Sequence, residues 1–173
     1  MIETKRLIIR QFKQDDFTDL FAYLSKPETY VYEPGRPISI EEAQQMCIER
    51  AKGNDFLAVE LKDNHKMIGH LYFKQIEPVE FMTWELGYIF SPEYQRQGYA
   101  SESAKALLEY GFTNSKIHRI MARCNLENIA SWKLLERVGF IREGHFRKYA
   151  FFHRNERGQP IWTDAYEYSM LGE

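Results

Sequence analysis

The spacing of apolar residues along the chain changes several times, and each change predicts a new secondary-structure element. Residues 7–12 alternate between two faces, as a half-buried strand does. Residues 15–24 then carry apolar side chains three and four positions apart, which predicts an amphipathic helix. A second helix is expected from Ser39 to about residue 52, because Ser39 and Glu42 have the spacing of a capping box.

Three strand-like runs joined by short turns come next and predict an antiparallel meander over residues 56–61, 67–74 and 83–90. The later elements are expected in the order helix, strand, helix and two long strands, over residues 99–112, 119–124, 129–138 and, around a turn at 155–160, 140–170. No repeat or flexible linker interrupts this pattern. We therefore expect a single α+β domain that covers residues 1–173.

Composition narrows the class of protein. The chain has 173 residues, of which 44% are hydrophobic and 28% charged, so a disordered chain is excluded. Cys47 and Cys124 lie far apart, which predicts two buried, reduced thiols rather than a disulfide framework. The sequence shows neither an apolar signal core nor a run long enough to span a membrane. We expect a cytoplasmic protein without a membrane partner.

Charge is unevenly distributed along the chain. The net charge of −2 argues against a dedicated nucleic-acid-binding domain. Residues 1–90 carry 11 basic and 15 acidic side chains, whereas residues 91–157 carry 12 basic and 7 acidic ones. The second segment therefore suits an anionic ligand and the first a cationic one, provided that folding keeps them apart.

The junction between the strand that ends at Phe90 and the helix that begins near Gly98 is the most informative stretch. Pro92 ends the strand, a polar loop with Arg96 follows, and the small Ala100 allows a helix to pack closely on a sheet. Free amides and the positive dipole at a helix N-terminus bind phosphate or pyrophosphate. An ordinary strand-to-helix turn also uses glycine, so both interpretations stay open. The Walker and dinucleotide glycine patterns are absent.

Further motifs occur at matching intervals around this loop. They are an opening segment over residues 3–12 followed by Asp15-Asp16, Trp84-Glu-Leu-Gly-Tyr88 before the loop, Gln95-x-x-Gly98-x-Ala100 in the loop itself, and Asn125-x-x-Asn128-x-x-Ser131 with the Leu135 to Gly144 stretch after it. Together they resemble the GNAT acetyltransferases, and within these the RimJ/RimL-like branch, which includes ribosomal-protein N-terminal acetyltransferases. The likeness extends from about residue 3 to residue 171.

The resemblance implies a GNAT fold, with a mixed and mostly antiparallel sheet flanked by helices, and acetyl-CoA as cofactor. It places the CoA pyrophosphate on the backbone of Gln95, Arg96, Gln97, Gly98, Tyr99, Ala100 and Ser101. It places the pantetheine arm as an extra strand along Tyr88, Ile89 and Phe90. Asn128 and Ser131 would face the pantetheine and the thioester.

Acetyl transfer to an amine requires a proton acceptor, because an α-amino group has a pKa of about 8 and a lysine about 10.4. Glu85 is our candidate for this base, or for the head of a water relay. Strand alternation places Glu85 on the same face as Ile89, so a solvated or salt-bridged position is an equal alternative. Glu102, in the first turn of the helix, is expected to stabilise the helix dipole.

The acid that protonates the leaving thiolate is less apparent. Many members of the family have a tyrosine where this chain has Leu135, which shifts attention to Ser131. The alternative is that Ser131 bonds only its own helix backbone. Five scattered histidines lack the spacing of metal ligands, so no metal is expected.

Several acceptors are compatible with these motifs. A primary amine is expected, above all a protein or peptide N-terminus, with a polyamine or an antibiotic as the alternative. A catalytically idle acyl-CoA-binding module and an RNA-binding domain are the rivals from other classes. A group of aromatic side chains has two interpretations, the lining of an acceptor cleft or the core, and most are expected in the core: Tyr30, Tyr32, Trp84, Tyr149, Phe151, Phe152 and Trp162. A monomer and a homodimer are both compatible with the sequence.

Overall fold

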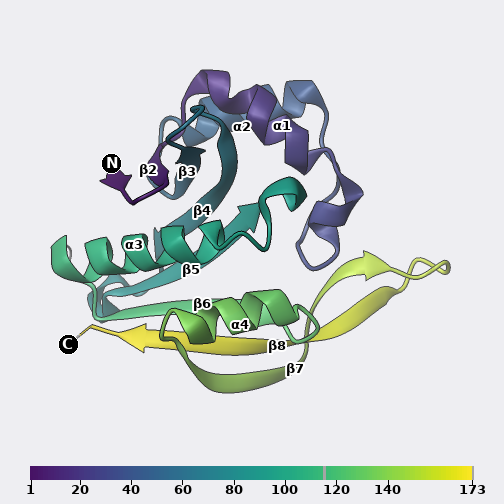
Figure 1. Ribbon diagram of the computed structural model, residues 1–173. Helices are drawn as coiled ribbons and strands as arrows, with labels where there is room; N and C mark the ends of the chain where they lie inside the picture. Colours follow the sequence, from purple (N-terminus) through teal and green to yellow (C-terminus); the bar gives the residue numbers. More distant parts are fainter. Residues whose placement is uncertain (115, 173) are drawn as a thin grey trace.

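The computed structural model describes residues 1–114 and 116–172, and an eight-stranded sheet is at its centre (Figure 1). The strands lie in the order β1-β2-β3-β4-β5-β6-β8-β7. Neighbouring strands are antiparallel except β5 and β6, which are parallel. The bounds are Ile2–Glu3 (β1), Leu7–Gln11 (β2), Phe56–Leu61 (β3), Met67–Gln75 (β4), Thr83–Phe90 (β5), Arg119–Asn125 (β6), Ile141–Arg154 (β7) and Pro160–Leu171 (β8).

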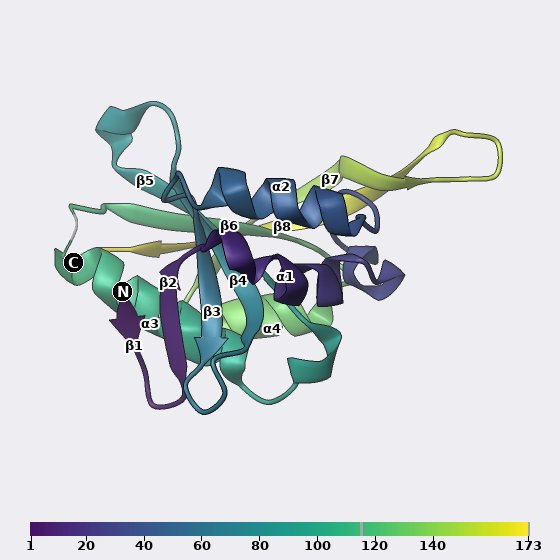
Figure 2. The ribbon, with the colours of Figure 1, turned by 90° about the horizontal axis from the view of Figure 1, so that it is seen from above.

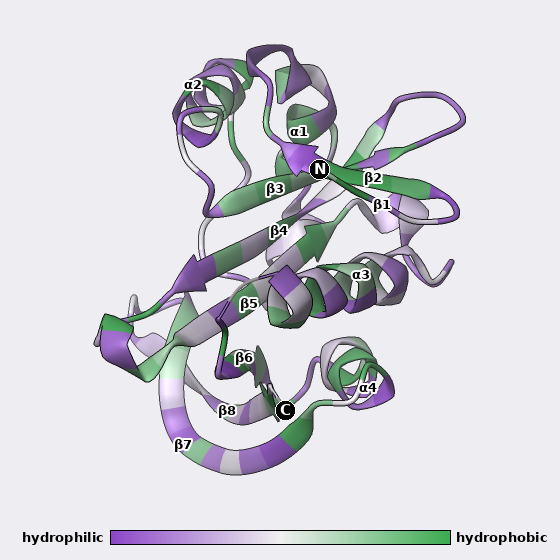
Figure 3. Cartoon of the chain, turned by 90° about the vertical axis from the view of Figure 1, so that its left-hand side faces the viewer, coloured by the Kyte–Doolittle hydropathy of each residue, from purple (hydrophilic) through white to green (hydrophobic). Residues whose placement is uncertain are grey.

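Two pairs of helices cover opposite faces of the sheet (Figure 3). The helices are α1 (Phe17–Leu24) and α2 (Ile40–Arg50) on one face, and α3 (Tyr99–Asn114) and α4 (Ile129–Arg137) on the other. Adjacent residues of β3 show this division, since Ala58 belongs to the core under α1 and α2 and Val59 to the core under α3 and α4. Strand alternation thus supplies both cores from one sheet.

The α+β architecture, with a mixed and mostly antiparallel sheet flanked by helices, and the order of the main elements confirm the sequence prediction. The capping box forms as expected: the Glu42 amide donates to Ser39 Oγ at 3.2 Å, and the Ser39 amide donates to Glu42 Oε2 at 2.8 Å. The first predicted helix instead begins with a 3₁₀ turn over Gln14–Asp16. Strand β1 was missed because two residues carry no periodicity.

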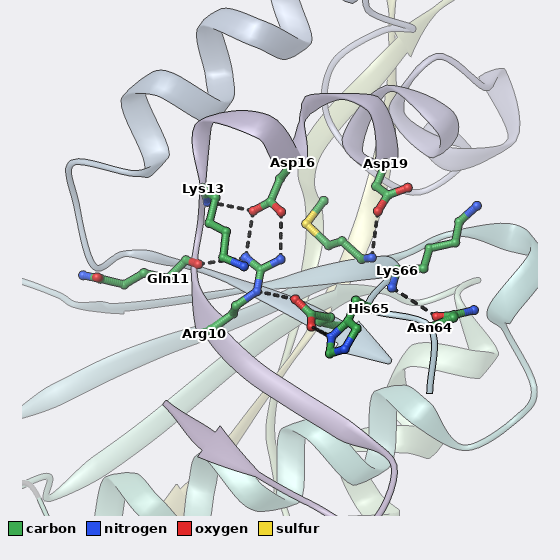
Figure 4. Close-up of polar contacts among 10 residues, drawn as sticks. Arg10, Gln11, Lys13, Asp16, Asp19, Asn64, His65 and Lys66 are labelled. Atoms are coloured by element: carbon green, nitrogen blue, oxygen red, sulfur yellow. Dashed lines mark hydrogen bonds and ion pairs between the residues drawn. The ribbon is translucent and has the colours of Figure 1, made fainter. Parts of the chain in front are cut away.

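Arg10 on β2 joins three segments through buried ion pairs (Figure 4). Its guanidinium donates to both carboxylate oxygens of Asp16, at 2.7 and 2.8 Å, and to Glu60 on β3, at 2.6 Å. The second oxygen of Glu60 lies 2.8 Å from His65 Nδ1. Because each buried carboxylate is paired, the network fixes the start of α1 against the sheet.

The parallel strands β5 and β6 pair over only three residues each, 83–85 with 119–121. Strand β5 continues to Phe90 and β6 to Asn125, and this part of each strand has no partner in the other. The two strands therefore part from each other toward their carboxyl ends. This opening in the sheet positions the candidate site.

Strands β7 and β8 extend beyond the sheet as a hairpin that projects from the body, here called the arm (Figure 2). The expectation that its aromatic side chains lie in the core is wrong for Tyr149, Phe151 and Trp162, which are 45%, 37% and 50% exposed. Strand β8 pairs with β6 only from Ala165 onward, so the arm lacks a third strand to cover it. Tyr30, by contrast, is a core residue.

Both cysteine side chains, Cys47 and Cys124, are free thiols and buried, as predicted. Of the helices described, none has the length and apolar character needed to cross a membrane.

Candidate active site

The opening between β5 and β6 contains a cavity of about 190 Å³. Its walls come from β5, β6, the start of α4, the loop between the 3₁₀ helix Pro27–Tyr30 and α2, and the arm. The lining residues are Tyr32, Glu33, Pro34, Leu86, Gly87, Tyr88, Ala122, Arg123, Cys124, Asn125, Asn128, Ser131, Tyr149, Ala150, Phe152, Thr163, Asp164 and Ala165. Three residues that the sequence selected are therefore brought together here, Tyr88, Asn128 and Ser131.

The loop before α3 is a tightly held turn. Gly98 has a φ angle of +82°, which glycine adopts without the steric cost that other residues meet. The Gln95 side chain donates to the Phe90 carbonyl at 3.2 Å, and the Gln97 side chain donates to the Glu93 carbonyl at 3.0 Å. These bonds fix the loop to the end of β5.

The first amide of α3 that bonds a carbonyl is that of Glu102, which donates to the Gly98 oxygen at 3.0 Å. The amides before it have no helical acceptor and are available to an anion. They belong to Tyr99, Ala100 and Ser101. Arg137 on α4, which sequence reasoning missed, donates to Ser101 Oγ at 3.2 Å and so adds a positive charge at this helix end.

Glu102 has a structural role beyond the expected effect on the dipole. Its carboxylate accepts hydrogen bonds from Thr4 Oγ1 at 2.6 Å and from the Arg6 amide at 3.0 Å, and it forms an ion pair with the Arg6 side chain. Burial raises the pKa of Glu102, but these hydrogen bonds outweigh it and the pKa lies below its usual value. Arg6 also donates to the Gln97 carbonyl at 3.1 Å, so Glu102 and Arg6 brace the loop.

Three residues surround the place where strand β5 faces α4. The hydroxyl groups of Tyr88 and Ser131 lie 2.9 Å apart. Asn128 caps α4, because its side-chain oxygen accepts from the Ser131 amide at 3.2 Å. Burial raises the pKa of the Tyr88 phenol, so it stays protonated at neutral pH and holds the Ser131 hydroxyl in place.

The remaining residues predicted to follow the pantetheine lie on the unpaired part of β5. Phe90 is buried in the core under α3 and α4, while Ile89 packs against the core under α1 and α2. Both side chains are thus engaged in packing. The backbone groups on this edge of β5, which have no partner in β6, are the ones that a ligand in the opening can bind. An extended ligand arm can add here as a strand does.

Glu85 lies outside the cavity lining. It pairs across the sheet with Lys74, and its carboxylate is 4.0 Å from the guanidinium of Arg123, which does line the cavity. Arg123 in turn donates to Glu167 at 2.8 Å. The role of Glu85 as base or relay residue stays a prediction.

Two carboxylates line the cavity, and the sequence analysis singled out neither of them. Asp164 is engaged, since its oxygens lie 2.7 Å from His145 Nε2 and accept from the Lys148 amide at 2.9 Å. Glu33 differs: burial raises its pKa to about 7, and among the described residues no cation or donor offsets that effect.

Glu33 was missed because its position depends on distant segments. It lies in an aperiodic loop, Tyr32-Glu33-Pro34-Gly35, which carries no helix or strand signal. The arm contacts this loop where His153 Nε2 donates to the Val31 carbonyl at 3.2 Å. The sequence beside Glu33 contains only an aromatic residue and a turn, and neither is enough to predict that its carboxylate is buried.

No group of three or more potential metal ligands occurs among residues 1–114 and 116–172. The groups that the site offers to a ligand are loop amides, an unpaired strand edge and the hydroxyl groups in the cavity. That combination suits an acyl donor with an anionic anchor and an extended arm, and it defines a CoA-dependent acyltransferase.

Comparison with known proteins gives the family. Residues 6–141 match the acetyltransferase (GNAT) domain, and the chain belongs to this family. It is 38% identical over 174 residues to the uncharacterized N-acetyltransferase YnaD of Bacillus subtilis, with 99% of this chain and 97% of that protein covered. The protein is thus an N-acetyltransferase, and acetyl-CoA is its cofactor.

Solved structures agree on the fold. A GNAT-family acetyltransferase from Bacillus anthracis superposes with a TM-score of 0.89 at 32% identity, covering 99% of this chain and 98% of that one. The ribosomal-protein-S5-alanine acetyltransferase of Vibrio fischeri gives 0.81 at 25% identity, over 99% and 96%. The spermidine N-acetyltransferase of Vibrio cholerae, in complex with CoA and spermine, gives 0.81 at 22% identity, over 98% and 97%.

Proposed function

We propose that this enzyme acetylates the α-amino group of a protein or peptide N-terminus, in a direct ternary complex, as a RimJ/RimL-like acetyltransferase. The observation that carries the proposal is a single opening in the sheet. Strand β5 lines the cavity at Leu86 to Tyr88, beside Ser131, and then leads to the loop before α3, which would bind the anionic part of the donor. Donor and acceptor can therefore meet without a covalent enzyme intermediate.

The donor side follows from the loop and the strand edge. The backbone of Gln95 to Ser101 would hold the pyrophosphate, with Arg96 and Arg137 adding positive charge. The edge of β5 from Tyr88 to Phe90 would bind the extended arm. Acetyl-CoA supplies the acetyl group as a thioester; the free amides of this edge would donate to its carbonyl oxygen, where negative charge develops.

Proton delivery to the leaving sulfur is assigned to Ser131. The conjugate thiol has a pKa of about 8.5, so the thiolate leaves with little help from an acid and a hydroxyl is a sufficient donor. Tyr88 orients that hydroxyl at 2.9 Å, and Asn128 fixes the helix turn that carries it. This pair takes the place of the acid that Leu135, a buried core residue, cannot supply.

The acceptor side favours a peptide N-terminus over a polyamine. The cavity of about 190 Å³ is small, so it suits the amine-bearing end of a larger molecule. Its carboxylates are Glu33 and the engaged Asp164, and Arg123 adds a positive charge. A polyamine carries several positive charges and would need more than one open carboxylate. The solved structures of similar fold include a ribosomal-protein-S5-alanine acetyltransferase and a spermidine N-acetyltransferase. The charges that line the cavity favour an acceptor of the first kind, a protein N-terminus.

Release of the CoA thiol tests this proposal. The purified enzyme is mixed with acetyl-CoA and, separately, with N-terminal peptides, the same peptides with a blocked N-terminus, and spermidine. We expect thiol release with free N-termini only. Release with spermidine alone supports the polyamine alternative, and acetyl-CoA binding without release from any amine supports the idle module.

The proposal includes three expectations from the sequence. Residues 1–173 act as one domain, since a continuous sheet joins both ends of the chain. The enzyme works in the cytoplasm. It is a monomer or a homodimer.

A further inference from the structure

Glu33 differs from every other acidic residue near the reaction site. It lines the cavity together with Tyr88 and Ser131, whereas Glu85 does not. Asp164, the second carboxylate of the lining, is occupied by His145 and the Lys148 amide. Glu33 is therefore the carboxylate that remains available to a ligand within the described part of the chain.

The charge of Glu33 affects two other groups of the cavity lining, Tyr88 and Cys124. Burial is the main reason why the pKa values of Tyr88 and Cys124 are raised, and the charge of Glu33 raises both further. Glu33 and Ser131, the hydrogen-bond partner of Tyr88, line the same cavity. An amine that enters this cavity therefore meets the Glu33 side chain.

The loop that carries Glu33 is held from both sides. The Tyr30 hydroxyl donates to the Leu24 carbonyl at 2.9 Å before it, and Gly35 turns the chain after it with a φ angle of +110°. A side chain at Gly35 would meet the Tyr30 ring at 3.1 Å. The arm bonds the Val31 carbonyl through His153. The backbone on both sides of Glu33 is thus held in place by the fold.

We propose that the Glu33 carboxylate accepts the proton of the acceptor amine and is a catalytic residue of this enzyme. The inference rests on the proposed function. The acceptor ammonium gives one proton to Glu33, the neutral nitrogen forms a bond to the acetyl carbon, and the carbon–sulfur bond breaks. The sulfur leaves with the bonding electron pair and takes a proton from Ser131, which regains one as the new amide nitrogen loses its extra proton. Glu33 returns its proton to water.

A base in this position should titrate near neutrality, because burial raises the pKa of Glu33 to about 7. That value lies below the pKa of about 8 for an α-amino group, so transfer to Glu33 is only slightly uphill. The charged and titratable groups that face it across the cavity come from β5, β6, the arm and its own loop: Tyr88, Arg123, Cys124, Tyr149, Asp164 and Tyr32.

The test compares Glu33→Gln and Glu33→Asp with Glu28→Gln, a matched control at an exposed position of the preceding 3₁₀ helix. We expect Glu33→Gln to lower kcat/KM at least about 100-fold, as loss of a general base does. In this variant kcat/KM should no longer increase with pH around an apparent pKa near 7. The increase with pH that comes from deprotonation of the acceptor amine should remain. Glu33→Asp should keep part of the activity with a shifted profile, and Glu28→Gln should behave as wild type.

A second readout does not depend on turnover. Carbon-13 NMR titration of the cofactor-free protein should show a glutamate carboxyl signal that titrates near pH 7 and is absent from Glu33→Gln. Acetyl-CoA affinity, measured by calorimetry, should change less than about threefold. A Glu33→Gln enzyme that keeps its rate and its pH profile overturns the inference alone; a wild-type enzyme that acetylates no amine overturns the proposed function as well.

Discussion

The Tyr88 hydroxyl lies 2.9 Å from Ser131 Oγ, which couples the strand before the Gln95–Ser101 loop to the first turn of α4. The two residues are 43 positions apart in the sequence. Because Tyr88 stays protonated and has its oxygen against the serine, the two hydroxyl groups act as one hydrogen-bonded unit. This unit is the structural reason for assigning proton delivery to Ser131.

Replacing Ser131 should slow the chemical step without removing cofactor binding. We expect Ser131→Ala to lower kcat about 10- to 100-fold. This loss is small for the removal of a general acid, because the thiolate is a good leaving group. Tyr88→Phe should cost less. The double variant should be no slower than Ser131→Ala, since the residues act through one bond. Additive losses measured by steady-state kinetics would contradict the coupling.

Gly98→Glu should weaken acetyl-CoA binding at least about tenfold, equivalent to about 1.4 kcal/mol. The new side chain is strained at a φ angle of +82° and brings negative charge to the proposed pyrophosphate position. Gly158→Glu is the matched control, because Gly158 also has a positive φ of +73° but lies in the arm turn with nothing near its Cβ position. Calorimetry should show a loss only for Gly98→Glu, and equal affinities would remove the loop assignment.

Glu33→Gln should stabilise the protein at neutral and higher pH. The folded-state pKa of about 7 exceeds the ordinary value of 4.5, so the folded state binds more protons between these values and its stability falls as pH rises from about 4.5 to 7. The variant lacks this loss and should gain about 1–3 kcal/mol at pH 8 and almost nothing at pH 4. Urea unfolding at both pH values measures the difference, and a gain independent of pH would contradict the assignment.

The buried network around Arg10 predicts a large loss on removing one carboxylate. Asp16→Asn should destabilise the fold by about 3 kcal/mol, because it leaves part of a buried guanidinium unpaired. Glu3→Gln, which removes an exposed partner of Lys62, should cost far less, because water screens that ion pair. Similar losses for the two variants in urea unfolding would contradict the weight given to burial.

The same network predicts that the folded protein loses stability at acid pH. Burial raises the pKa of Glu60, but hydrogen bonds from His65 and Arg10 outweigh it and the pKa lies below 4.5. A lowered pKa stabilises the fold above the unfolded value, and that contribution is lost as pH falls through the folded one. Wild-type stability should therefore decline below about pH 4.5, and this decline should be smaller in Glu60→Gln.

Local features of the sequence predicted local structure well. The capping box at Ser39 and the meander over β3, β4 and β5 depend on neighbours in the chain, and both formed as expected. The loop before α3 was found from residue types alone, because glycine and a following helix define it.

Features that depend on contacts between distant segments of the chain were harder to predict from the sequence. The parallel pairing of β5 with β6 joins residues over 30 positions apart, and its early end, which opens the sheet, leaves no local signal. Glu33 reaches the cavity through an aperiodic loop held by the arm. The exposure of the aromatic arm depends on where β6 stops pairing with β8. Each of these depends on packing between distant segments.

The most direct measurement follows a labelled acetyl group. The enzyme is incubated with acetyl-CoA carrying carbon-13 in the acetyl group and with a peptide that has a free N-terminus, and mass spectrometry locates the label while released thiol is counted. We predict label on the α-nitrogen in an amount equal to the thiol released, and almost none with Gly98→Glu at low acetyl-CoA. Acetyl-CoA that binds to the wild-type enzyme but transfers no label to any amine would contradict the account.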